Sequence, residues 1–324
     1  MPCSTRGFAM SNYPFQEHFV AEAEAPAQAP GASKSDDAGN APSSQWAVAW
    51  RHLRRRPLFW VSATLILGAV LMAAFPQLFS SADPRACDLA RSLAGPESGH
   101  IFGFDRQGCD IYARTVYGAR ASVLVGILTT VVVVLIGTTV GAVAGYFGGI
   151  ADTILSRLTD VFFAVPLVLA AIVVMQMFRD HRTIITVVIV LGLFGWTSIA
   201  RITRGTVMSV KNEEYVTAAR AMGQPGWKTL ITHIVPNSAA PIIVYATVAL
   251  GTFIVAEATL SFLGIGLPTT VVSWGGDISA AQASLRTKPM VLFYPAAALA
   301  LTVLSFIMMG DVVRDALDPK ARKR

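Results

Sequence analysis

Long apolar segments dominate the chain after residue 50, and short polar or charged stretches separate them. A helix that crosses a bilayer needs about 20 mostly apolar residues, so stretches with few or no charged side chains locate the candidate spans. The qualifying segments, named by their bounding positions, are 57–82, 121–151, 160–179, 182–201, 228–267 and 288–311. The pattern therefore predicts an all-α polytopic membrane protein with six transmembrane helices.

Basic residues are unevenly distributed between these segments. Four arginines directly precede the first span: Arg51, Arg54, Arg55 and Arg56. More basic residues lie between the fourth and fifth spans and in the C-terminal tail, whereas residues 80–117 hold more acids than arginines. Lys and Arg concentrate on the cytoplasmic side of membrane proteins. We therefore expect both termini to be cytoplasmic and residues 80–117 to be outside.

The same features divide the chain into parts. Residues 1–50 are rich in Ala, Pro, Ser and Gly, so we expect a disordered cytoplasmic segment. The apolar run comes too late and is too long for a signal peptide. The remaining parts are a first span (51–80), an extracytoplasmic segment (81–118), a core domain (119–313) and a basic cytoplasmic tail (314–324).

The composition agrees with a membrane protein and disfavours a soluble enzyme. The chain has 324 residues, of which 53% are hydrophobic and 14% charged, whereas soluble domains have about 25% charged residues. The net charge of +6 is explained by residues that orient helices, so no nucleic acid is expected as a partner. Three cysteines are too few for a disulfide scaffold and lack metal-ligand spacing.

The stretch between the fourth and fifth spans, about 208–237, is too regular for a simple loop. Residues 213–222 predict an amphipathic helix with acids in its first turn and Arg220 in its last, as the helix dipole favours. Four residues at helical spacing form one small, mostly apolar face of this helix: Tyr215, Ala218, Ala219 and Met222. Gly223 follows this helix and can adopt a positive φ at little cost, which suits a helix end. Pro225 suits the first position of a second helix, 226–234, which ends at Pro236.

This helix–Gly–helix hairpin has two interpretations. It can dock on another protein through its small exposed face, or it can lie on the lipid surface as an amphipathic helix. Glu213 and Glu214 open the first helix, and anionic lipid would repel them. The sequence therefore favours protein docking.

The hairpin sequence resembles a known motif. "TAARAMG", followed nine residues later by "HIVP", is similar to the EAA loop of ABC-importer permeases, with matches at Ala218, Ala219, Gly223 and Pro236. Thr217 stands where that family usually has Glu. Five further segments resemble the C-type subunits of dipeptide and oligopeptide permeases: "GFDRQGCDIYARTVYGARAS", "GYFGG", "AEATLSFLGIGLP", "SWGGDI" and "GDVVRDALDP". Phe104 and Cys109 replace the usual Thr and Arg.

The resemblance implies the type I ABC-importer permease fold in a bacterial cytoplasmic membrane. It implies a second, B-type permease, two cytosolic ATPase subunits or domains, and an extracytoplasmic substrate-binding protein as partners. It also implies that the hairpin couples the ATPases to the pore, through Glu213, Glu214, Tyr215, Ala218, Ala219, Arg220, Gly223 and Pro236. The chain lacks a Walker A motif, because "GQPGWKT" has no Gly before its Lys and follows no strand. We expect no cofactor and no catalysis by the chain itself.

Polar residues within the spans are functional candidates. Glu257 either faces the pore or the partner permease, or is hydrogen-bonded within helix packing, which we favour. Asp160 is expected to pair with Arg157 one turn earlier. Arg201 and Arg204 are expected to extend toward the interface as snorkelling anchors.

Small residues and a proline predict how two of the spans pack. Gly137, Gly141 and Gly145 form a small-xxx-small series that allows close helix packing. Pro166 is expected to kink the third span.

Two groups of residues lie in the expected outer segments. Cys87 and Cys109 are either bridged or free thiols, and the sequence leaves both open. Trp274 and Asp277 are candidates for an outer gate or for docking of the binding protein. For Trp274, an ordinary aromatic anchor at the membrane interface is an equal alternative.

Other function classes fit less well. A secondary transporter or channel would need coupling carboxylates or inverted repeats, and a membrane enzyme would need paired His or acidic groups within the spans. The resemblance implies di- or oligopeptides as the substrate, with nickel or glutathione as the alternative, because close relatives of this permease family carry them.

Overall fold

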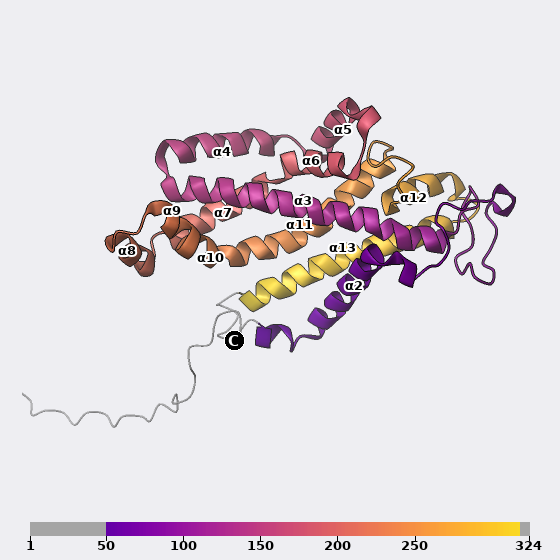
Figure 1. Ribbon diagram of the computed structural model, residues 1–324, viewed down its shortest axis with the longest axis horizontal. Helices are drawn as coiled ribbons and strands as arrows, with labels where there is room; N and C mark the ends of the chain where they lie inside the picture. The colour runs from indigo at the N-terminus through magenta and orange to yellow at the C-terminus, as the bar shows by residue number, and fades with distance from the viewer. Residues whose placement is uncertain (1–49, 318–324) are drawn as a thin grey trace, which may run out of the picture. The chain divides into compact units, whose positions relative to one another are not determined.

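The computed structural model describes residues 50–317, and the helices given below lie in that range (Figure 1). Contacts divide the chain into residues 1–43 and 44–324, and the described part belongs to the second unit. Residues 1–49 of the predicted disordered segment and the last seven residues of the predicted basic tail lie outside the described residues. Within 50–317 the secondary structure is helical, and the only strand-like pairings are isolated bridges.

The helices are bounded as follows: α2 Pro57–Ala74, α3 Ile111–Phe147, α4 Gly149–Ala164, α5 Leu167–Met177, α6 Ile184–Gly195, α7 Thr197–Val210, α8 Glu214–Ala221, α9 Gly226–Thr229, α10 Val235–Asn237, α11 Ala239–Phe262, α12 Trp274–Ala281 and α13 Met290–Leu317. A π-helical turn, η4 (Leu230–Ile234), joins α9 to α10. Four short 3-10 turns are η1 Pro76–Leu78, η2 Leu89–Arg91, η3 Arg179–His181 and η5 Gln282–Ser284.

Four of these helices, α2, α3, α11 and α13, are long and apolar enough to cross a membrane. Two further segments are bent pairs, α4 with α5 at 82° and α6 with α7 at 45°, which gives up to six spans. Each of the six apolar segments therefore contains helix, but the third and fourth are broken rather than straight. The third also starts earlier than predicted, since α4 begins at Gly149 and not near residue 160. Pro166 lies at the first break, as predicted, because it follows Val165 in extended conformation and precedes α5.

Helix α3 begins ten residues before the predicted start of the second span. Asp110 caps it, since its carboxylate accepts hydrogen bonds from the Tyr112 and Ala113 amides at 2.8 and 3.3 Å. The early turns carry Arg114, whose charge is paired with Asp277. Charge therefore marks the edge of an apolar interval but not the end of a helix.

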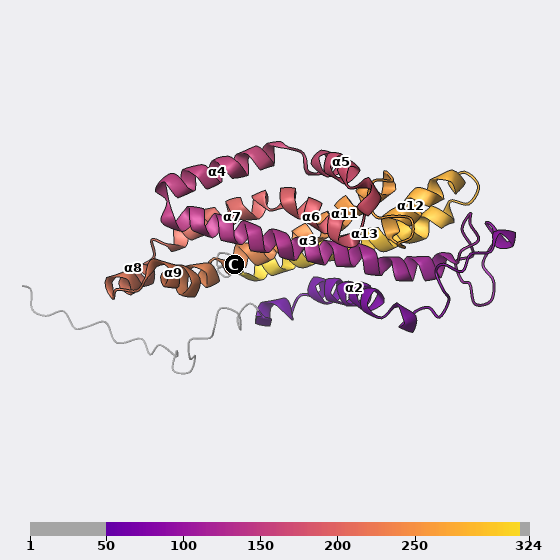
Figure 2. The ribbon, with the colours of Figure 1, turned by 45° about the horizontal axis from the view of Figure 1, so that its top comes forward.

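Helix α3 also lies at the centre of the packing (Figures 1 and 2), where it contacts α7, α11, α6 and α2. Its glycines permit close approach to α7. A Cβ on Gly137 would lie 2.7 Å from the Trp196 carbonyl oxygen, and one on Gly141 would overlap the carbonyl oxygen of Ala200. The predicted small-xxx-small packing is confirmed.

Ion pairs join α4 to α7. Arg204 Nε binds Asp152 at 2.5 Å, and Arg201 binds Asp160 at 2.8 Å. The expected pair between Arg157 and Asp160 is present at 3.7 Å. Acids on α4 therefore hold both guanidinium groups, which the sequence did not indicate, and the snorkelling of Arg201 and Arg204 stays a prediction.

Candidate functional site

The predicted hairpin is formed by α8 and by the continuous turn from α9 to α10 (Figure 1). Gly223 has a φ of +81°, as predicted. Its amide donates to the Arg220 carbonyl at 2.9 Å, and the Gln224 amide donates to that of Ala219 at 3.2 Å. These hydrogen bonds end α8, with Gly223 in the left-handed conformation directly after the helix. Pro225 lies one position earlier than predicted, because it precedes α9 instead of starting it.

The buried side of the hairpin is an apolar cluster at the base of α3 and α7. Fully or nearly fully buried residues form it: Ala142, Val207, Val216, Leu230 and Ile234. Ala219 is also buried, at 3% exposed. The prediction that Ala219 shares the exposed face is therefore wrong. The helix turns Val216 and Ala219 inward together because they are three residues apart.

The outer side of the hairpin is exposed and largely uncharged. Met222 is 82% exposed, and Tyr215, Ala218 and Trp227 are also exposed. Partial desolvation by the surrounding chain raises the pKa of the exposed Tyr215 phenol, and the Glu213 carboxylate adds to that rise. Glu213 and Glu214 lie at the start of α8, and Pro236 lies exposed within α10. Seven of the eight predicted coupling residues are therefore accessible, and Ala219 supports them from beneath.

The hairpin is also fixed to the end of α3 by contacts that the sequence did not reveal. The Arg220 guanidinium lies 4.9 Å above the Tyr146 ring, and Trp227 packs against Phe147 at 4.8 Å. Lys211 Nζ donates to the Gly145 carbonyl at 2.8 Å. No short-range pattern could show these contacts, since the paired residues lie more than 60 positions apart.

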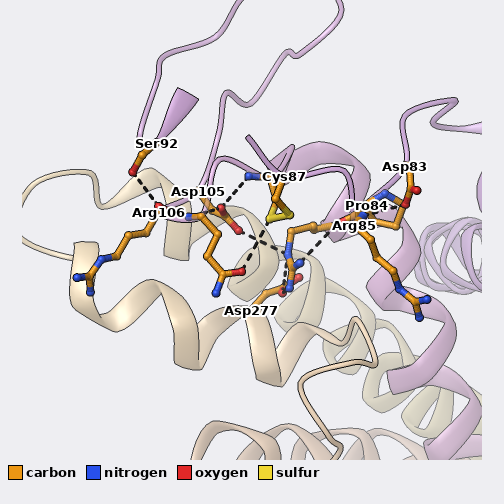
Figure 3. The surroundings of a disulfide bond; sticks show 11 residues. Asp83, Pro84, Arg85, Cys87, Ser92, Asp105, Arg106 and Asp277 are labelled. Carbon is orange, nitrogen blue, oxygen red and sulfur yellow. Dashed lines mark hydrogen bonds and ion pairs between the residues drawn. A yellow bond between two sulfur atoms is a disulfide. The ribbon is translucent and has the colours of Figure 1, made fainter. Parts of the chain in front are cut away.

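At the other end of α3, residues 80–110 form a cap, here named the outer cap because the charge pattern predicts that this segment lies outside. Cys87 and Cys109 are joined in a disulfide (Figure 3). The turn that carries Cys109 is closed by Asp105, whose carboxylate accepts from the Gln107 and Cys109 amides at 2.8 and 2.9 Å. Gly108 lies directly against Asp88, where a Cβ would overlap the carbonyl oxygen. The cap is thus tightly closed beside the disulfide.

Arg114 connects this cap to α12, on which Asp277 lies. Its Nε donates to Asp277 Oδ1 at 2.9 Å and lies 3.7 Å from Asp105. Burial raises the pKa of Asp277 to about 6, although Arg114 opposes this rise. The three charged residues line a cavity of about 370 Å³, together with apolar residues including Val291 and Pro295. The sequence did not reveal the role of Arg114, because its partner Asp277 lies 163 positions away. Asp105, nine positions before Arg114, was not singled out either.

Trp274 is fully buried, and its Nε1–H donates to the Thr115 carbonyl at 2.8 Å. The interpretation of Trp274 as a membrane-interface anchor is therefore wrong. Glu257 is also fully buried and accepts a hydrogen bond from the Ser261 hydroxyl at 2.7 Å. Its surroundings in this chain are those of a carboxylate within helix packing, the interpretation that the sequence favours. A role at the pore or at the partner permease stays a prediction.

Among residues 50–317, no group of three His, Cys, Asp or Glu side chains could hold a metal ion. The arrangement instead offers an accessible hairpin at one end and a cross-linked polar cap at the other.

Comparison with known proteins agrees with this picture. Residues 137–323 match the family described as "Binding-protein-dependent transport system inner membrane component", and residues 44–96 match the "N-terminal TM domain of oligopeptide transport permease C". These matches define the class, a transport component of the membrane rather than an enzyme. The chain belongs to the family of binding-protein-dependent ABC-importer permeases, in the C-type branch of the dipeptide and oligopeptide systems.

The relatives are similar over most of their length. The oligopeptide transport system permease protein OppC of Bacillus subtilis is 38% identical, covering 86% of this chain and 91% of the relative. The dipeptide transport system permease protein DppC of Alkalihalophilus pseudofirmus is 36% identical, covering 86% of this chain and 91% of the relative. The glutathione transport system permease protein GsiD of Pectobacterium atrosepticum is 36% identical, covering 86% of this chain and 92% of the relative.

Proposed function

We propose that this chain carries peptides across the bacterial cytoplasmic membrane as one of two permeases in an ATP-driven importer. Its partners are a B-type permease, two ATPase subunits or domains, and an extracytoplasmic binding protein. Two cytoplasmic termini, predicted from the basic residues, place the hairpin on the side of the ATPases. The peptide substrate is supported by the OppC and DppC relatives.

The hairpin is the observation that carries the proposal. Its inner face is packed on α3 and α7, and its outer face presents Tyr215, Ala218 and Met222. An ATPase that pushes on this outer face would move α3 and α7 with it, because the buried cluster joins them. ATP binding and pore state would then bias the same two-state element, which is what coupled transport requires.

The test is Gly223→Pro in the complete importer. Proline cannot adopt a positive φ and removes the amide that donates to Arg220, so the hairpin turn cannot form. We expect normal membrane insertion, with peptide uptake reduced at least tenfold and no longer stimulated by ATP. Gly205→Ala is the matched control, since Gly205 has open space around it and no positive φ. Normal ATP-dependent uptake by Gly223→Pro would contradict the coupling role.

Glutathione, itself a small peptide, is the second candidate substrate, because the GsiD relative is nearly as similar as the peptide permeases. Uptake of labelled glutathione and of labelled dipeptides by the same importer separates the two. Transport by the chain alone without ATP would instead favour the different class, a secondary transporter or channel.

A further inference from the structure

A turn of basic residues directly precedes α2. Residues 50–53 are helical. The Arg54 amide donates to the Trp50 carbonyl, and the Arg56 amide donates to that of Leu53, each at 3.1 Å. The indole Nε1–H of Trp60 donates to the Arg54 carbonyl at 3.0 Å. The arginines are therefore carried on an ordered backbone rather than on a loose linker.

Three guanidinium groups of this turn are available to a ligand. Arg51, Arg54 and Arg55 are exposed, and within residues 50–317 none of them forms an ion pair. Arg56 is different, because it binds Asp315 on α13 at 2.5 Å. That ion pair holds the end of α13 beside the turn, so the basic groups lie next to a junction of two candidate spans (Figure 1).

Two tryptophans flank the arginines. Trp50 and Trp60 are 53% and 55% exposed. Both pack edge-on against Phe59, with ring centroids 5.8 and 5.4 Å apart. Indole rings prefer the level of the lipid head groups. The aromatic group therefore places the arginines at that level, where phosphate groups lie.

We propose that the basic turn, Trp50–Arg56 together with Trp60, binds the phosphate of an anionic phospholipid. A guanidinium group suits phosphate because its N–H donors match two oxygens at once. Basic clusters next to a span attract anionic lipid. Orientation of the first helix requires only positive charge on one side, and it explains neither the ordered turn nor the two exposed indoles.

The experiment measures lipid binding to the full chain in detergent, by native mass spectrometry. The probes are phosphatidylglycerol and phosphatidylcholine with identical acyl chains. In R54Q/R55Q, we expect the affinity for phosphatidylglycerol to fall roughly thirtyfold and that for phosphatidylcholine to stay unchanged. The matched control is R157Q/K228Q, which removes two exposed charges elsewhere and should retain the wild-type affinity.

Two results would overturn the proposal. One is an equal loss in both double variants, which would show an effect of net charge alone. The other is full displacement of the lipid by millimolar inorganic phosphate, which would show a site for free phosphate. If R54Q/R55Q does not insert, the single variants R54Q and R55Q provide the same test, each with an expected loss of about fivefold.

Discussion

The hairpin and the outer cap occupy opposite ends of α3 and are stabilised by different forces (Figure 2). The hairpin rests on a cluster of buried apolar side chains, including Val216 and Ile234. The cap is held by a disulfide and by the charged group of Asp105, Arg114 and Asp277. The buried cluster joins the hairpin to α3 and α7 without a covalent link, whereas a disulfide and directional ion pairs fix the cap. The difference suits an inner end that moves as a unit and an outer end that keeps its shape.

The largest expected effect comes from removing the apolar base of the hairpin. Ile234→Ala should weaken its attachment by about 2–5 kcal/mol, because a fully buried side chain leaves a cavity. Hydrogen exchange of the amides in α8 and η4 should accelerate while that of the cap stays unchanged. Ile231→Ala is the control, since Ile231 is exposed. Equal protection in both variants would show that the cluster does not hold the hairpin.

Removal of the disulfide tests the other end. In a Cys87→Ser/Cys109→Ser variant, the cap should lose about 3 kcal/mol of stability, as expected for a cross-link over 22 positions. Proteolysis should then cut within residues 84–110, with no change at the hairpin. In the wild type, neither thiol should react with an alkylating agent before reduction. Alkylation of both without reductant would exclude the bridge.

The buried Asp277 predicts that cap stability depends on pH. Its pKa is raised from 3.8 to about 6, so between about pH 4 and pH 6 the folded chain binds more protons than the unfolded chain. Stability of the cap should therefore fall as the pH rises through that window, by about 2–3 kcal/mol in total. Hydrogen exchange in α12 at pH 4.5 and pH 7 measures this. Asp277→Asn should remove the pH dependence, and an unchanged profile would contradict the assignment to this residue.

The smallest effect is expected at the start of α8. Glu214→Gln removes a negative charge from the first turn, where it interacts favourably with the helix dipole, and should cost roughly 0.5 kcal/mol. Exchange of the α8 amides should rise two- to threefold at low salt and less at high salt. A loss as large as that of Ile234→Ala would show that charge, not packing, holds the hairpin.

The sequence was sufficient for features that depend on neighbouring residues. Apolar length located the six helical segments, Pro166 located the break before α5, and Gly223 located the left-handed turn. Pro166 predicted the bend of the third segment, whereas nothing in the sequence predicted the bend of the fourth. Hydropathy reports the length and polarity of a segment, whereas a bend depends on what the segment packs against.

In the candidate site too, features that depend on neighbouring residues could be predicted, and features that depend on distant contacts could not. The exposed residues of the hairpin followed from helical spacing, but the burial of Ala219 depends on where α3 and α7 lie. Arg114 and Asp277 are 163 positions apart and carry no local signal of their pairing. Trp274 has the sequence context of an interface anchor, and only the packing of α12 shows that it is buried.

Helix α3 has 37 residues, so it is about 55 Å long at 1.5 Å per residue. One end of this rod belongs to the cap and the other to the base of the hairpin. A tilt of about 5° around its midpoint would shift each end by roughly 2–3 Å in opposite directions. A shift of one end of α3 at one membrane surface would thus produce an equal and opposite shift of its other end. No series of side-chain rearrangements between the two ends is needed.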